Sequence, residues 1–192
     1  MPEPTETLSP QLATYRQGFL DRKQEARDLS DGVDAARLAV VPDDESWSVA
    51  QIFDHLNTAG WLLLNEIERA IDEARTNGPF GEPPFAYGFI SRWFVRAMQP
   101  SSSWTFTAPS VFEPESSATL HPNEAVREFV ALQDHFADCL PQTVGLDLRR
   151  IRVASPAVPL LRISLGAWFE ATLAHERRHL QQARTVLDRV GG

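Results

Sequence analysis

The chain has 192 residues, of which 43% are hydrophobic and 23% are charged, and it carries a formal net charge of −8 at pH 7. This length predicts one domain spanning residues 1–192, with residues 1–8 flexible at its start. The acidic balance argues against nucleic acid or a membrane surface as the main partner, because both attract a basic surface.

Hydrophobic periodicity predicts four long helices. Apolar residues recur at spacings of three and four over about residues 10–29, 48–74, 123–140 and 164–190. Ser48 or Ser46 is suited to cap the second helix, and Asn77-Gly78-Pro79 is suited to end it. Prolines bound the third helix at both ends.

Two long connections join these helices. Residues 77–122 are rich in Pro, Gly, Ser and aromatic residues, including Trp104 and Phe106, and they contain a short helical pattern at about residues 89–98. A connection of this length and composition is expected to be packed and functional. Residues 141–163 contain three prolines and no clean alternation, which predicts an ordered loop without strands. The whole pattern predicts an all-α fold, a four-helix bundle with long crossover connections.

Three histidines are predicted to face the core of this bundle. His175 and His179 are four residues apart, so their imidazoles lie on one face of the last helix, within its apolar stripe. His55 lies on the edge of the apolar face of the second helix. Three imidazoles from two facing helices would bind one divalent ion and leave positions open to water or substrate, as in catalytic sites. The alternative is that each is a core histidine hydrogen-bonded to a neighbour.

The last helix also contains the zincin-like order His-Glu-Arg-Arg-His, in which Glu176 would be the general base of a metalloprotease. Thirteen residues follow His179, and none of them is the His or Glu that such a protease needs as third ligand. We therefore favour a ligand set in which His55 completes the HxxxH pair. Glu176 stays a candidate general base, although it could equally be solvated or ion-paired. His135 and Cys139 also have ligand spacing, but a lone helical cysteine is more often a buried apolar residue.

The two segments that carry the histidines resemble those of a known family. WSVAQIFDHL at residues 47–56 is followed far downstream by LAHERRHLQQ at residues 173–182. Together they are similar to the DinB-like (DinB/YfiT) superfamily of four-helix-bundle proteins. The resemblance covers most of the chain and implies that His55, His175 and His179 bind a metal ion, zinc or nickel. It also implies that Gln182 orients these ligands through a hydrogen bond.

Some members of the family are similar to thiol S-transferases that use bacillithiol or mycothiol. The resemblance thus implies a metal-dependent transferase that activates a low-molecular-weight thiol, of the bacillithiol, mycothiol or glutathione type, or water. The activated group would attack a small electrophile, in detoxification or stress response. The basic residues Arg177, Arg178, Arg149, Arg150 and Arg152 could hold the carboxylates of such a thiol. Ordinary surface charge explains them equally well.

Two other functions stay open. One is metal-dependent hydrolysis with Glu176 as general base. The other is a non-enzymatic module in which the ion ties helices together for binding or dimerisation. Bundles of this kind often pair, so we expect a homodimer. The single Cys139, the lack of a signal-peptide pattern and the lack of an apolar run near ~20 residues predict a cytoplasmic protein without a membrane span.

Overall fold

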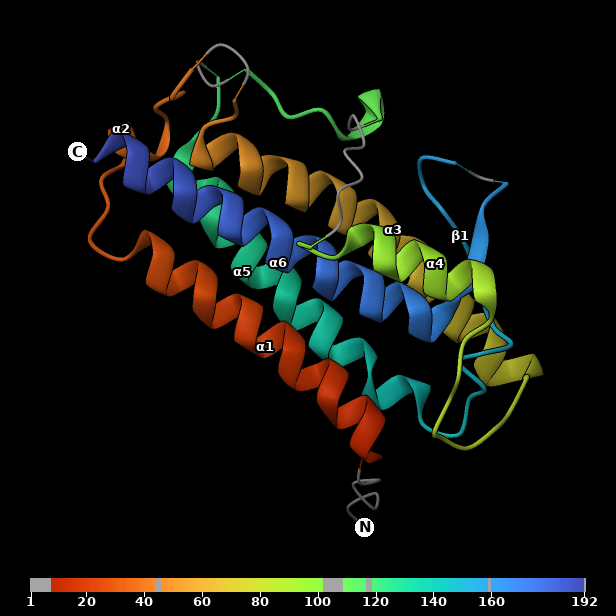
Figure 1. The fold of residues 1–192 in the computed structure, drawn as a ribbon. Coiled ribbons are helices and arrows are strands. Elements are labelled where there is room, and N and C mark those ends of the chain that lie inside the picture. The colour runs from red at the N-terminus through yellow and green to blue at the C-terminus, as the bar shows by residue number, and fades with distance from the viewer. Residues whose placement is uncertain (1–7, 44–45, 102–108, 117–118, 159, 192) are drawn as a thin grey trace.

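The computed structural model describes residues 8–43, 46–101, 109–116, 119–158 and 160–191. Four long helices form the body of the protein (Figure 1): α1 (Pro10–Ser30), α3 (Val49–Asn77), α5 (Pro122–Cys139) and α6 (Leu165–Val190). The shorter elements are α2 (Ala35–Leu38), α4 (Phe89–Met98), the 3-10 helices η1 (Ser110–Phe112) and η2 (Pro141–Thr143), and the strands β1 (Arg152–Ala154) and β2 (Arg162–Ser164). The predicted all-α fold is confirmed.

The four long helices pack as a bundle. α1 and α3 each contact both α5 and α6, and α4 lies along α6 on the outside of the bundle (Figure 1). None of the helices among the described residues is long and apolar enough to cross a membrane. Residues 1–7, in the start predicted to be flexible, and the aromatic residues Trp104 and Phe106 lie outside the described residues.

The start of α3 is held by a capping box. The Ser48 hydroxyl accepts a hydrogen bond from the Gln51 amide at 3.2 Å, and the Gln51 side chain accepts one from the Ser48 amide at 3.0 Å. Ser48, not Ser46, is therefore the cap. The helix ends at Gly78, whose φ of +76° is a conformation that glycine adopts without strain. These two signals fix where α3 begins and ends, and so where its inner face points.

The connection between α5 and α6 corrects one expectation. β1 and β2 form an antiparallel pair, with Val153 opposite Ile163, whereas the sequence predicted no strands there. Each strand has three residues, which is too short for alternation to be seen in the sequence. Val153 and Ile163 are both buried and anchor this hairpin to the core beside the start of α6.

The core consists of two apolar clusters. One lies toward the end of α3 and the start of α6 and contains Phe19, Phe136 and Phe169; the rings of Phe19 and Phe136 stack with centroids 4.8 Å apart. The other lies toward the start of α3 and the end of α6 and contains Phe53 and Phe129, whose centroids are 5.3 Å apart. In chain order, polar residues fall between the two clusters on three of the long helices: Arg22 on α1, Asn57 on α3, and Thr172, His175, Glu176 and His179 on α6. We call these residues, with His55 and Gln133, the polar layer.

Candidate metal centre

Two helices bring the three histidines together. His55 lies in the second turn of α3, close to the capping box, and His175 and His179 lie one turn apart in the middle of α6. One ring nitrogen from each histidine lies within 4.8 Å of those from the other two. Among the described residues, this is the group of His, Cys, Asp or Glu side chains whose ligand atoms converge in a way that could hold a metal ion. The expected juxtaposition is therefore present.

One pair of these nitrogens has the spacing of two ligands of one small cation. His55 Nε2 and His175 Nε2 are 3.4 Å apart. Two imidazole nitrogens that bind the same tetrahedral zinc ion at ~2.0 to 2.1 Å are ~3.3 Å from each other. The rings are inclined to one another by 60° to 75°. An all-imidazole donor set fits zinc or nickel better than magnesium or calcium.

Two hydrogen bonds decide which nitrogen is free in two of the three rings. The Nδ1 atom of His55 lies 2.7 Å from the carbonyl oxygen of Phe112, and the Nδ1 atom of His179 lies 2.9 Å from Oε1 of Gln182. Since an oxygen of this kind accepts, each Nδ1 carries the proton and donates it. In the neutral ring, Nε2 then keeps its lone pair and faces the other histidines. Gln182 thus contacts His179 at the position that the resemblance implied.

Burial keeps these imidazoles neutral. Removal from water lowers the pKa of His55, although the Phe112 carbonyl and Asp54 oppose that effect. Burial, followed by the neighbouring His179 and His55, lowers the pKa of His175 well below its ordinary value. Burial and the nearby His55 lower the pKa of His179 to about 4. Neutral imidazole is the form that binds a metal ion, so the site is in its ligating form at neutral pH.

A loop and a tryptophan enclose the site. The amide of Glu115 donates to the Asp54 carboxylate at 2.9 Å, and the Gln51 side chain donates to the Glu115 carbonyl at 3.2 Å. These contacts hold residues 109–116 against α3 and place the Phe112 carbonyl at His55. The ring of Trp47 lies 5.0 Å from that of His55 and 6.4 Å from that of His179. Sequence reasoning missed the Phe112 carbonyl, because a backbone acceptor leaves no signal in the sequence.

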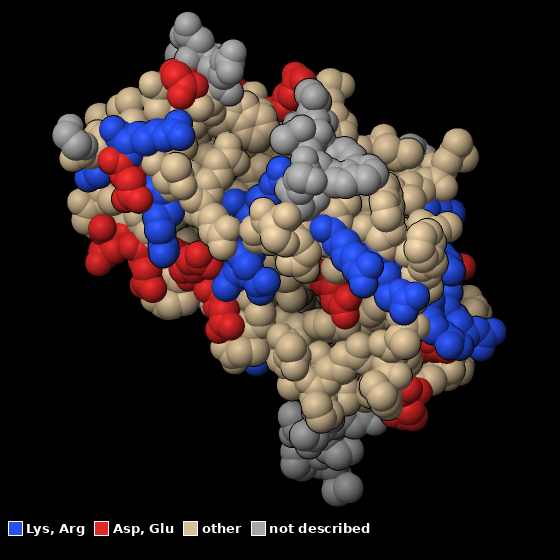
Figure 2. Space-filling view, viewed as in Figure 1, with Lys and Arg blue, Asp and Glu red and all other residues tan. Residues whose placement is uncertain are grey.

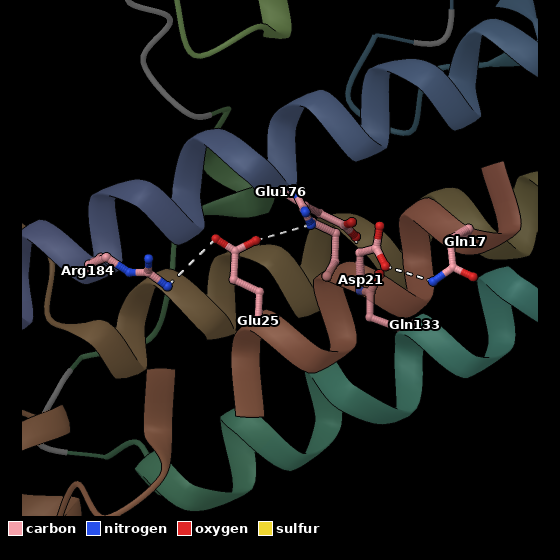
Figure 3. A network of polar contacts seen from close by, with 7 residues as sticks. Gln17, Asp21, Glu25, Gln133, Glu176 and Arg184 are labelled. Carbon is pink, nitrogen blue, oxygen red and sulfur yellow. Dashed lines mark hydrogen bonds and ion pairs between the residues drawn. The ribbon is translucent and has the colours of Figure 1, made fainter. Parts of the chain in front are cut away.

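Glu176 lies on a different side of α6 from the histidines. Its side chain reaches toward α5, where Gln133 Nε2 donates to Glu176 Oε1 at 3.0 Å, and α1 lies alongside (Figure 3). Glu176 is 2% exposed, and burial raises its pKa to about 8, although Gln133 and then Arg22 act in the opposite direction. Within the described ranges it forms no ion pair, so it is neither solvated nor salt-bridged. The half-buried carboxylate of Glu25 on α1 pairs elsewhere, with Arg184 at 4.0 Å (Figure 3).

The second candidate pair of ligands lies in two different environments. His135 is exposed and its ring packs edge-on against Trp61, with centroids 5.0 Å apart. Cys139 is 1% exposed, and burial, with the nearby Glu68, raises its pKa to about 12. The thiol therefore stays protonated at neutral pH, which makes it a poor nucleophile and a poor ligand.

The chain is similar to a known protein family. Residues 19–183 match a family model described as the DinB superfamily, which covers most of the chain and includes all three histidines. Searches of curated proteins and of solved structures each return no match.

Proposed function

The chain belongs to the DinB superfamily, and from this membership and its three-histidine site we propose that it is a metal-dependent transferase. His55, His175 and His179 would hold the ion, zinc or nickel. The nucleophile would be a low-molecular-weight thiol of the bacillithiol, mycothiol or glutathione type, or water, and the acceptor a small electrophile of the kind met in stress. We further propose that the protein acts in the cytoplasm as a homodimer.

One observation carries this proposal: three neutral imidazoles from α3 and α6 bring one ring nitrogen each within 4.8 Å of one another. A divalent cation bound there would lower the pKa of a thiol or a water molecule and so favour the thiolate or hydroxide, which are the nucleophilic forms. The chain's own residues supply the rest. The Phe112 carbonyl and Gln182 orient two of the rings, and Trp47 covers them on one side.

The thiol would have to arrive with a cofactor. Cys139 is the one cysteine of the chain, it lies on α5 in an apolar cluster, and burial raises the pKa of its thiol to about 12. An exogenous thiol needs a site with open coordination positions, and three protein ligands leave such positions.

The hydrolytic alternative has less support. A general base must reach the proton that it removes and must be ionised when it does so. Glu176 bonds to Gln133 on the α5 side of α6, and its raised pKa of about 8 keeps it largely protonated at pH 7. The non-enzymatic alternative, a metal-stabilised binding or dimerisation module, shares the histidine site and differs in having no turnover.

A direct test compares two neighbouring residues of α6. The untagged protein is analysed for metal by mass spectrometry, loaded with zinc or nickel, and assayed for conjugation of glutathione, bacillithiol and mycothiol to a chromogenic aryl halide. We expect His175→Ala to lower metal affinity and turnover by at least ~100-fold, since even a hydrogen-bond partner of a metal ligand contributes 10- to 100-fold. Glu176→Gln should keep the metal affinity and the turnover of the parent.

The control for the test is His121→Ala, which removes an exposed histidine at the start of α5. Turnover that survives His175→Ala would exclude the transferase proposal. Metal binding without turnover of any of the three thiols would favour the binding module. Loss of conjugation in Glu176→Gln, with metal retained, would show that Glu176 takes part in the reaction.

A further inference from the structure

A second polar hollow lies away from the histidines, at the first turn of α4. It has a volume of about 450 Å³ and is lined by Ala86, Tyr87, Gly88, Arg149, Arg150 and Arg152. Tyr87 packs against Gly166, the second residue of α6, so closely that a Cβ on that glycine would lie 1.9 Å from the Tyr87 hydroxyl. His175 is nine residues further along α6, or about 14 Å at 1.5 Å per residue. The hollow is thus separate from the metal centre.

The cations of this hollow lack protein partners. The side chains of Arg149, Arg150 and Arg152 are exposed, and no carboxylate among the described residues forms an ion pair with them. Asp147 is the nearest acidic residue in the chain, and its Oδ1 atom accepts the backbone amides of Arg149 and Arg150 at 3.0 and 3.1 Å. That carboxylate therefore shapes the turn. Three unpaired guanidinium groups at one hollow are unexpected in a chain of net charge −8.

The backbone adds to the positive field. Gly88 is the N-cap residue of α4, a helix of 10 residues, and it offers no side chain to accept from the first-turn amides. Ser91 does not cap the helix either, because its hydroxyl bonds to Ser164 at 3.4 Å. The free amides and the helix dipole favour an anion at this end. Ser164 in turn donates to the Arg149 carbonyl at 2.8 Å, which holds the arginine segment beside α4.

The remaining walls are neutral and firmly held. The Tyr87 hydroxyl lies 2.9 Å from that of Tyr15, and burial, with the nearby carboxylates of Glu170 and Asp147, raises the Tyr87 pKa to about 12. The Tyr87 hydroxyl itself is therefore neutral at neutral pH. Two further arginines, Arg92 and Arg96, are exposed on α4 itself. Figure 2 shows basic side chains running along α4 and gathering where this helix begins.

We propose that this hollow binds a small molecule through an oxyanion, a phosphoryl or carboxylate group held by Arg149, Arg150 and Arg152 at the start of α4. Planar guanidinium groups match such oxygens bidentately, and backbone amides at a helix start complete the donor set. The volume exceeds that of a lone anion and suits a small organic molecule. This site stands whether or not the metal centre is catalytic.

The test uses inorganic phosphate and the metal-free His175→Ala protein, so that no ion at the histidines can bind the probe. Amide chemical shifts are followed by nuclear magnetic resonance during a phosphate titration at constant ionic strength, with chloride as the competing salt. We expect saturable shifts at Ala86, Gly88 and the first turn of α4. Shifts that chloride reproduces, or that do not saturate, would overturn the proposal.

A pair of variants separates this hollow from general surface charge. Arg149→Gln combined with Arg150→Gln should weaken phosphate binding at least tenfold, since both side chains are exposed and their removal leaves the fold intact. The matched control is Arg127→Gln, an exposed arginine of α5 that pairs with Glu124 at 3.6 Å, and it should bind phosphate as the parent does. Equal affinity in the double variant and the control would overturn the proposal.

Discussion

The two sides of the polar layer use buried polar groups in opposite ways. Toward α3, His55, His175 and His179 bring one ring nitrogen each within 4.8 Å of one another. Toward α5, Glu176 bonds to Gln133, while Glu176 Oε2 and Gln133 Oε1 have no hydrogen-bond partner among the described residues. His175 and Glu176 are consecutive in the chain, yet they face different helices.

The same burial has opposite consequences on the two sides. Desolvation disfavours the charged form of any group, so it removes the proton from an imidazole and keeps the proton on a carboxyl. On the histidine side, the imidazoles are left neutral, which is the form that binds a metal ion. On the glutamate side, protonation turns one unpaired oxygen into a donor. The layer therefore separates a ligand set that is ready for a metal from an acid that is held neutral.

The largest expected effect concerns Glu176 in alkaline solution. Its pKa is raised from 4.5 to about 8 in the folded protein, so the folded state binds more protons than the unfolded state between these pH values. The neutral carboxyl makes its full contribution to the free energy of unfolding below pH ~4.5. This contribution falls as pH rises to ~8, by roughly 5 kcal/mol at most. Glu176→Gln has no such loss. We expect the variant to be more stable than the parent at pH 9 and within ~1 kcal/mol of it at pH 5, measured by urea unfolding.

Glu128→Gln, a change at an exposed carboxylate of α5, is the control for that experiment. Raised pKa values are also found for Tyr15, Tyr87 and Cys139. All three proteins contain these groups, so their contributions to the pH dependence of stability cancel in the comparison. If the free energy of unfolding of Glu176→Gln and of the parent depended equally on pH, the two sides of the polar layer would not differ as described.

A smaller effect of opposite sign is expected in acid for the metal-free protein. The pKa of His179 falls from 6.5 to about 4 on folding, so the unfolded state binds more protons in this window. Stability is complete above pH ~6.5 and is lost as pH falls to ~4, by on the order of 3 kcal/mol for His179. His179→Gln should show a shallower loss in urea unfolding between pH 7 and 4, and His121→Gln should not. Saturating zinc should move the loss to lower pH, because the ion competes with protons.

The smallest expected effect comes from Gln182, which bonds to His179 from the exposed surface of α6. Gln182→Ala should weaken zinc affinity by ~10-fold, about 1.4 kcal/mol, because the ring loses its orienting acceptor. Competition with a chromogenic chelator measures this change. Gln181→Ala, at the adjacent exposed position, is the control. An effect at Gln181 as large as at Gln182 would mean that the hydrogen bond does not orient the ring.

The bundle and the histidine cluster could be predicted because both depend on periodicity along single helices. The 3.6-residue repeat places His175 and His179 on one face, and the capping signal at Ser48 fixes which face of α3 carries His55. The family resemblance, now confirmed by the match over residues 19–183, assigned the histidines of the two distant segments to one site.

The side of α6 that Glu176 faces could not be predicted, because it depends on which helices become neighbours. A turn of 100° from His175 is compatible with solvent or with another helix, and the contact with Gln133 is made across the bundle. The same holds for the Phe112 carbonyl, which reaches His55 from a loop. The β1–β2 pair was missed because three-residue strands carry no periodic signal.

The sequence distance between the histidines gives the site a role in the topology of the chain. His55 and His175 are 120 residues apart, so an ion bound to both would act as a cross-link that closes a ring containing α4, α5 and the β1–β2 hairpin. Such a cross-link restricts the unfolded chain only if the ion stays bound to both histidines after unfolding. An ion that binds only the native state stabilises that state by mass action instead. Loading with metal would thus tie the first half of the bundle to its last helix, and chelation would release them.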